Sequence, residues 1–223
     1  TISLDNSAAA VTIVVDMDDT TNFEKIVVAD ADGAGATQQN ITVTFAAIAA
    51  ATVQNIELDA SAITDVNDDL MVTNSAASTT TTFTIKGGAG DDTIAGSNGN
   101  DTLTGNGGID TITTNAGVDI VNGGAGNDTI MMAGNLTSAD QIDGGDDTDT
   151  LSLNAGNADA DFTLVTNVET VTNATAGTLT LGAFAQAAGV RTVVLTNAIN
   201  TVTAGAYTTA MTVDAKASTN KLD

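Results

Sequence analysis

The chain has 223 residues, a length that suits one or two ordinary domains or one elongated solenoid. Its 28 acidic residues outnumber five basic ones and give a formal charge of −23, which excludes a basic surface for binding nucleic acid. Cys and His are both absent, so disulfides, thiol catalysis and the commonest general base and transition-metal ligand are excluded. No signal peptide and no apolar run long enough to cross a membrane is present, and we expect a piece of a longer chain.

Residues 1–86 alternate between short β-branched runs and turns rich in Asp, Asn and Gly. This pattern predicts irregular β-solenoid coils, with strands at 10–16, 24–30, 41–45 and 80–86. In the last of these, Phe83 and Ile85 are expected to face inward. Two acidic clusters, 16–19 and 65–69, are either metal-ion sites or solvated turns.

From Gly87 to Met131 the chain repeats every nine residues, in five consecutive copies. The first and last copies fit Gly-Gly-x-Gly-x-Asp-x-U-x, where U is a large aliphatic residue. The middle copies lack one or both of the first two glycines, but all keep Gly at position four and Asp at position six. A disordered Gly/Asp-rich linker is the alternative, although a linker has no reason to keep an aliphatic residue at every ninth position.

Each nonad predicts a glycine-rich turn followed by a very short strand with one inward aliphatic side chain. No such strand can bury its side chain alone, so the copies must stack, with two nonads forming each coil. The expected fold is therefore all-β: a right-handed parallel β-solenoid, or β-roll, with calcium-binding turns in its centre. The inward side chains are those of Ile94, Leu103, Ile112, Val121 and Ile130.

Stacking brings the aspartates of alternate copies about 4.8 Å apart, where carboxylates repel one another unless a cation lies between them. A hard divalent ion that takes roughly 6–8 oxygens from carboxylates and backbone carbonyls suits such turns, so we expect several calcium ions. A further copy begins at Gly144, after twelve intervening residues that equal one nonad plus three. Counting through Asp140 extends the block to Ser152, with 134–139 as an enlarged turn.

The predicted metal ligands are the glycines and aspartates of these turns. They are Gly87, Gly88, Gly90, Asp92, Gly96, Gly99, Asp101, Gly105, Gly108, Asp110, Gly117, Asp119, Gly123, Gly124, Gly126, Asp128, Asp140, Gly144, Gly145 and Asp149. Asp92, Asp110, Asp128 and Asp149 are expected on one edge of the roll, and Asp101, Asp119 and Asp140 on the other.

Residues 153–223 return to strand-like runs separated by Asn, Ala and Gly, and predict further solenoid coils. The expected strands are 162–165, 178–181, 191–196, 201–203 and 211–214. The three glutamates of the chain, Glu24, Glu57 and Glu169, each follow an Asn-aliphatic pair near a strand start. They are either carboxylate ligands or lattice contacts, or else solvated residues at coil corners. The three parts, 1–86, 87–152 and 153–223, are interpreted as one continuous elongated unit.

The nonads resemble the RTX calcium-binding proteins, which are typically secreted by Gram-negative bacteria through the type I route and fold outside the cell on meeting calcium. The Thr/Ala/Gly/Asn-rich flanks resemble the lattice domains of calcium-dependent bacterial surface-layer (S-layer) proteins. This resemblance implies a secreted, extracellular structural domain that self-assembles at the cell surface as a homo-oligomer in a two-dimensional array, with calcium as a bridge to cell-surface polysaccharide. The alternative is the calcium-folded module of an RTX adhesin, toxin or hydrolase whose active domain lies elsewhere.

Catalysis by these residues is not expected. The sequence has no nucleophile elbow and no phosphate-binding Gly-x-x-x-x-Gly-Lys loop. Paired carboxylates hydrolyse glycosides in other proteins, but one Tyr and no Trp provide too few aromatic platforms for sugar rings.

Overall fold

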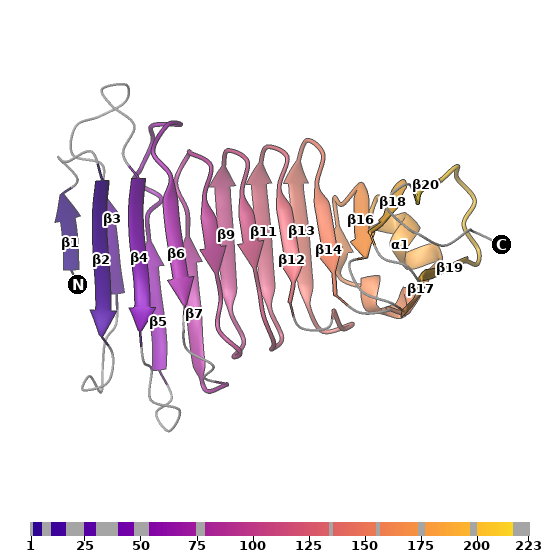
Figure 1. Cartoon of the computed structure of the whole chain (residues 1–223), viewed down its shortest axis with the longest axis horizontal. Helices are drawn as coiled ribbons and strands as arrows, with labels where there is room; N and C mark the ends of the chain where they lie inside the picture. Colours follow the sequence, from indigo (N-terminus) through magenta and orange to yellow (C-terminus); the bar gives the residue numbers. More distant parts are fainter. Residues whose placement is uncertain are drawn as a thin grey trace.

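The computed structural model describes residues 2–5, 10–16, 25–29, 40–46, 54–74, 79–133, 136–154, 157–173, 177–196 and 200–215. Within these ranges the chain winds into stacked coils, and nearly all regular structure is β-strand. Figure 1 shows the strands side by side along the long axis, from the N-terminal strands to the small helix α1 near the other end. Every strand pairing is parallel, so the predicted parallel β-solenoid is confirmed.

Alternate strands belong to two facing sheets. The odd sheet contains, in order, β1 (Ile2–Asp5), β3 (Lys25–Ala29), β5 (Gln54–Asp59), β7 (Thr81–Lys86), β9 (Thr102–Gly107), β11 (Ile120–Ala125), β13 (Gln141–Asp146) and β15 (Val165–Thr166). The even sheet contains β2 (Ala10–Asp16), β4 (Asn40–Ala46), β6 (Leu70–Asn74), β8 (Thr93–Ala95), β10 (Thr111–Thr113), β12 (Thr129–Met132), β14 (Thr150–Leu153), β16 (Thr170–Asn173), β18 (Thr192–Leu195) and β20 (Thr212–Asp214).

The core is a double column of aliphatic side chains between these sheets. In the even sheet Ile94 pairs with Ile112, which pairs with Ile130, and Ile130 pairs with Leu151 in the next coil. All the predicted inward residues of the nonads are at most 2 % exposed, and so are Phe83 and Ile85. One aliphatic residue per short strand is sufficient because each is covered above and below by its neighbours in the stack.

The C-terminal coils differ from the sequence prediction in two ways. Residues 162–165 were expected to be a strand, but the chain forms a 3-10 helix, η1 (Asp159–Phe162), and only two residues of strand β15. A third, two-stranded sheet of β17 (Gly177–Leu181) and β19 (Asn200–Ala204) widens the coils, and the helix α1 (Ala183–Ala187) packs against η1 and β15. The helix follows from Ala183-Phe184-Ala185-Gln186-Ala187, since Ala has the highest helix propensity.

No helix among the described residues combines the length and apolarity that a membrane span requires.

Candidate metal centre

The turns form two edges of the roll. Edge 1 contains the segments that lead from the odd sheet into the even sheet, 87–92, 105–110, 123–128 and 144–149, and the first three residues of each of the last three still belong to strands β9, β11 and β13. Edge 2 contains the turns that lead back, 96–101, 114–119 and the enlarged turn that ends at Asp140. Every predicted ligand therefore lies in a turn of one edge or at its junction with a strand.

The aspartates of edge 1 form a hydrogen-bonded ladder along the stack. The backbone N–H of Asp92 donates to Oδ1 of Asp110 over 2.7 Å, and that of Asp110 donates to Oδ1 of Asp128 over 2.8 Å. The N–H of Asp128 donates in turn to Oδ1 of Asp149, again over 2.8 Å. Each carboxylate therefore has one oxygen fixed by the coil before it.

Edge 2 repeats this ladder with three aspartates. The N–H of Asp101 donates to Asp119 Oδ1 over 2.9 Å, and the N–H of Asp119 donates to Asp140 Oδ1 over 2.8 Å. The last step spans 21 residues instead of 18, so the structure places Asp140 where the three-residue insertion predicts it. The glycine that begins the enlarged turn, Gly134, lies outside the described residues.

Both ladders begin where a buried apolar residue takes the aspartate position. The N–H of Leu70 donates to Asp92 Oδ1, and the N–H of Phe83 donates to Asp101 Oδ1, each over 2.7 Å. The side chains of Leu70 and Phe83 are 0 % and 1 % exposed. The carboxylate columns thus end against apolar core on their N-terminal side.

The seven ladder aspartates are at most 1 % exposed, and burial disfavours their charged form. Desolvation raises the pKa of Asp110 to about 8, and that of Asp92 and Asp119 to about 7. It raises the pKa of Asp101 and Asp149 to about 6, and the pKa of Asp128 is raised for the same reason. Without a cation, Asp92, Asp110 and Asp119 would hold protons near neutral pH.

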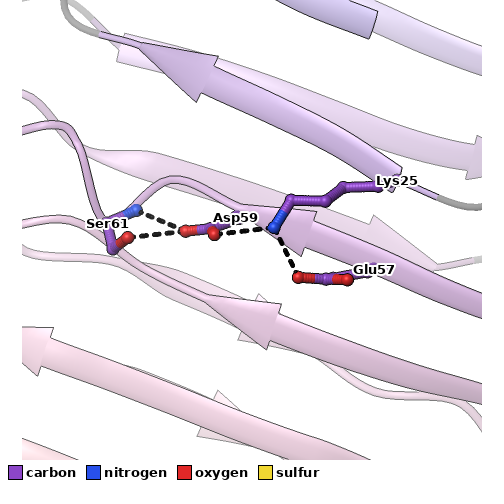
Figure 2. A network of polar contacts seen from close by, with 4 residues as sticks. All are labelled: Lys25, Glu57, Asp59 and Ser61. Atoms are coloured by element: carbon purple, nitrogen blue, oxygen red, sulfur yellow. Dashed lines mark hydrogen bonds and ion pairs between the residues drawn. The ribbon is translucent and has the colours of Figure 1, made fainter. Parts of the chain in front are cut away.

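Protein cations do not supply the missing charge. Among the described residues, both ion pairs belong to Lys25, whose Nζ lies 2.6 Å from Glu57 Oε1 and 3.0 Å from Asp59 Oδ2 on the odd sheet (Figure 2). Asp59 also accepts hydrogen bonds from Ser61 N and Oγ, and chiefly for this reason its pKa falls to about 2. Glu57 is thus an ion-pair partner of Lys25, and Glu24 lies outside the described residues.

On edge 1 the second carboxylate oxygen lacks a partner in three of the turns. Oδ2 of Asp110, Asp128 and Asp149 is buried and accepts no hydrogen bond from any described residue. A buried, unpartnered carboxylate oxygen is costly, and it is a common sign of a cation that neutralises it.

The backbone conformation at the second turn position accounts for these unpartnered oxygens. In the three turns this residue has a left-handed φ: 79° at Asn106, 119° at Gly124 and 111° at Gly145. In the first turn Gly88 does not, and its N–H donates to Asp92 Oδ2 over 2.7 Å. Where the second residue has a left-handed φ, its N–H does not donate to the aspartate Oδ2, and this oxygen has no hydrogen-bond donor among the described residues.

A backbone carbonyl of the next coil points at each of these oxygens. A Cβ added to Gly105 would lie 2.0 Å from Asp110 Oδ2 and 2.4 Å from the carbonyl oxygen of Gly123. The equivalent distances at Gly123 are 2.4 Å to Asp128 Oδ2 and 2.3 Å to the carbonyl oxygen of Gly144. Two oxygens converge on the same space, which suits a cation once the carboxylate is ionised, and any first-position side chain would fill the space.

Edge 2 is chemically different because hydroxyl groups contact its carboxylates. Ser97 donates to Asp101 Oδ2 through its backbone N–H over 2.6 Å and contacts the same carboxylate through Oγ. Thr137 donates to Asp140 Oδ2 from its N–H and its hydroxyl. Burial raises the pKa of Asp119, and a hydrogen bond from the Thr114 side chain offsets a small part of this rise. Because these hydrogen bonds already stabilise the carboxylates of edge 2, a bound metal ion should stabilise them less than those of edge 1.

The glycines at position four allow the turns to approach closely. A Cβ on Gly108 would lie 2.3 Å from the carbonyl oxygen of Gly90, and one on Gly126 only 1.9 Å from that of Gly108. Both residues also have a left-handed φ, of 103° and 124°. Asp147, which replaces the glycine in the last turn, keeps the same conformation with a φ of 77°.

Sequence reasoning missed separate hydrogen bonds at position five of the turns. On edge 1 the side-chain Oδ1 of Asp91 accepts the N–H of Ile109, and that of Asn127 accepts the N–H of Thr148. On edge 2 Oδ1 of Asn100 accepts the N–H of Val118. The signal was visible as Asp or Asn directly before the position-six aspartate. The acidic cluster 65–69 adds one such bond to edge 1, since Asp69 accepts the N–H of Asp91; the other cluster, 16–19, lies largely outside the described residues.

No group of three or more Asp, Glu, His or Cys side chains converges on one point within the described parts of the chain. A cation in these turns must therefore take most of its oxygens from backbone carbonyls and fewer from carboxylates. Calcium fits this donor set, because it accepts roughly 6–8 oxygens of mixed kind at about 2.3–2.6 Å in flexible geometry. The ladder aspartates and first-position carbonyls would hold it, and its charge would stabilise the buried carboxylates.

These features define a parallel β-roll whose turns carry buried carboxylates that a bound cation would neutralise. The family of RTX calcium-binding nonapeptide repeats, in four copies, matches residues 84–112, 96–130 and 136–158. The centre of the chain thus consists of RTX repeats and is a calcium-binding module for several ions, of a kind typical of secreted proteins. No curated protein and no solved structure matches the chain.

Proposed function

We propose that this chain is a structural, calcium-folded segment of a secreted bacterial surface-layer protein. The observation that carries the proposal is the continuity of the two sheets. The even sheet runs from β2 through the repeat strands β8 to β14 and on to β20. Within the described residues, the RTX turns therefore lie in the middle of a longer rod.

Rod geometry suits lateral packing into a layer. Large apolar side chains are exposed on the turns and outer faces, including Val66 at 68 %, Ile109 at 56 % and Ile120 at 45 %. We expect these side chains to take part in contacts between copies. Calcium held in the turns would stiffen each rod, and self-assembly would then build the array, with no catalytic role for these coils.

The test is electron microscopy of the purified chain at high protein concentration in millimolar calcium, with magnesium and chelator as controls. We expect ordered sheets in calcium only. A chain that folds on calcium yet stays monomeric under all conditions would contradict the proposal. That outcome would favour the second candidate, the calcium-folded module of an RTX adhesin, toxin or hydrolase, which the same repeats support.

A further inference from the structure

We propose that the calcium column of edge 1 ends in an additional site outside the nonapeptides, formed by Asp149, the backbone carbonyl of Asn167 and Glu169. It rests on the calcium-binding function proposed above and adds a carboxylate that no repeat motif contains.

The first part of this site is an unpartnered carboxylate oxygen. Asp149 is 0 % exposed, and its Oδ2 accepts no hydrogen bond from the described residues. A Cβ added to Gly144 would lie 2.5 Å from this oxygen and 1.9 Å from the carbonyl oxygen of Asn167. The same convergence recurs at each repeat of edge 1, but here the carbonyl comes from a coil that has no nonapeptide.

Glu169 completes the site by occupying the aspartate position of that coil. Thr150 pairs with Thr170, so Glu169 follows Asp149 in the column, and the N–H of Asp149 donates to Glu169 Oε2 over 2.9 Å. The turn between Asn167 and Glu169 is three residues shorter than 144–149, because Gly144 stacks on Asn167. A longer side chain is what a contracted turn needs to bring its carboxylate to the column.

Asn167 holds this turn in place. Its φ of 52° is left-handed, and its Nδ2 donates to Asp143 Oδ1 over 2.8 Å, in the coil before. The contracted turn is further tied to the next coil by the N–H of Val168, which donates to the carbonyl of Ala188 over 3.0 Å. The Asn167 carbonyl is therefore fixed before any cation arrives.

The column stops after Glu169 because the next coil offers a positive charge. Thr170 pairs with Thr192, which places Arg191 at the register position of the carboxylates. Its Nη1 donates to the carbonyl oxygens of Val190 over 2.8 Å and Gln186 over 3.3 Å. A guanidinium at this point disfavours a cation beyond Glu169, so the site is the last of edge 1.

The experiment counts calcium ions on the full chain by native mass spectrometry and follows hydrogen exchange of residues 165–173. In Glu169→Gln the amide oxygen still accepts the N–H of Asp149, but the charge is lost. We expect one ion fewer and loss of calcium-dependent protection in 165–173, with the repeats still protected. The control Glu57→Gln, in the Lys25 pair, should bind as many ions as the wild type.

An unchanged ion count and unchanged protection in Glu169→Gln would overturn the inference while leaving the calcium-binding function intact. A wild-type chain that binds no calcium would overturn both. If Glu169→Gln does not fold, Arg191→Gln carries the test. Removing this charge should lower the calcium concentration that fills the last site several-fold, and an unchanged concentration would contradict the proposal.

Discussion

At the scale of single residues, the ladder aspartates differ in what their second oxygen contacts. Asp92 Oδ2 accepts the N–H of Gly88, whereas Asp110 Oδ2 has no partner among the described residues. Asp92 Oδ2 therefore has a hydrogen-bond donor without metal, whereas Asp110 Oδ2 has none in the described part of the chain. Since an unpartnered buried charge is the costlier of the two, the benefit of calcium should be greatest at Asp110.

We therefore expect Asp110→Asn to weaken the calcium-bound fold and to stabilise the calcium-free fold. It should raise the calcium concentration needed for folding on the order of tenfold, because a charged ligand is lost. In chelator at pH 8 it should instead raise the melting temperature, because the amide removes a buried charge and can donate to the carbonyl of Gly123. Calcium titration and thermal melts followed by circular dichroism measure both effects.

Asp92→Asn is the matched comparison and should raise the calcium requirement less, since its second oxygen already has a donor. Asp146→Asn, at an exposed position of the last turn, should change neither the calcium concentration needed for folding nor the melting temperature in chelator. Equal effects at Asp92 and Asp110 would show that the unpartnered oxygen is irrelevant to calcium binding.

The raised pKa values predict an unusual dependence on pH. An aspartate ordinarily titrates near pH 3.8, but the metal-free fold raises the pKa of these groups to about 6–8. A raised folded-state pKa contributes stability that is fully present below about pH 4 and lost as pH rises through 6 to 8. Calcium requires the deprotonated carboxylates, so its affinity should fall over the same range as pH decreases.

Circular dichroism of calcium-stripped protein should therefore show more β-structure at pH 5 than at pH 8. With saturating calcium the difference should disappear. Equal or greater β-structure at pH 8 in the stripped protein would mean that the buried aspartates do not control the metal-free fold.

At the scale of the turn, backbone spacing limits which glycines can be replaced. Gly124 has a φ of 119°, and an added Cβ would lie 2.0 Å from the carbonyl oxygen of Asn106. Gly107 has open space, with its nearest contact at 3.7 Å. The two lie in successive coils of edge 1 but at different turn positions.

We expect Gly124→Ala to destabilise the calcium-loaded roll by roughly 1–2 kcal/mol from the left-handed conformation alone, with the clash adding to this. Gly107→Ala should stay within about 0.5 kcal/mol of the wild type, as surface substitutions usually do. Unfolding in denaturant with calcium held constant measures the difference. A small effect at Gly124 would mean that the turns are not packed as closely as the structure shows.

The two edges should also differ in metal binding. Asp128→Asn on edge 1 removes an unpartnered carboxylate, whereas Asp101→Asn on edge 2 removes one that Ser97 already contacts. We expect a larger rise in the calcium midpoint for Asp128→Asn, measured by calcium titration of both variants under the same conditions. The reverse order would assign the principal sites to edge 2.

The sequence predicts the coils well because the nine-residue period dictates which side chain turns inward and which aspartates stack. It does not reveal that the first turn of edge 1 differs from the later ones, since Gly88 and Gly124 occupy the same motif position with different φ. It singles out Glu169 as either a ligand or lattice contact or a solvated residue, but it does not place Glu169 in the aspartate column, because the turn before it is contracted and shares no motif with the nonads. The short helix α1 was missed since the strand-rich pattern around it favoured further coils.

At the scale of the whole molecule, the coils depend on calcium to different degrees. The N-terminal coils are held by apolar contacts, such as Phe45 against Phe83 with ring centroids 4.9 Å apart, and by the Lys25 network. Most strands of the central coils bury one aliphatic residue, and no cation among the described residues forms an ion pair with their buried carboxylates. Chelation should therefore not unfold the rod uniformly.

Hydrogen exchange after chelation at pH 8 should show protection lost first across 105–152, where the second oxygens are unpartnered, while strands β4 to β7 keep theirs for longer. Because each turn holds its carboxylate against the next coil, loss at one level should loosen its neighbours, and the transition across the block should be cooperative. Magnesium should restore little protection, since its smaller, near-octahedral shell suits carbonyl-rich turns poorly. Simultaneous loss of protection in β4 and β12 would instead make calcium a requirement of every coil, including those whose cores are apolar.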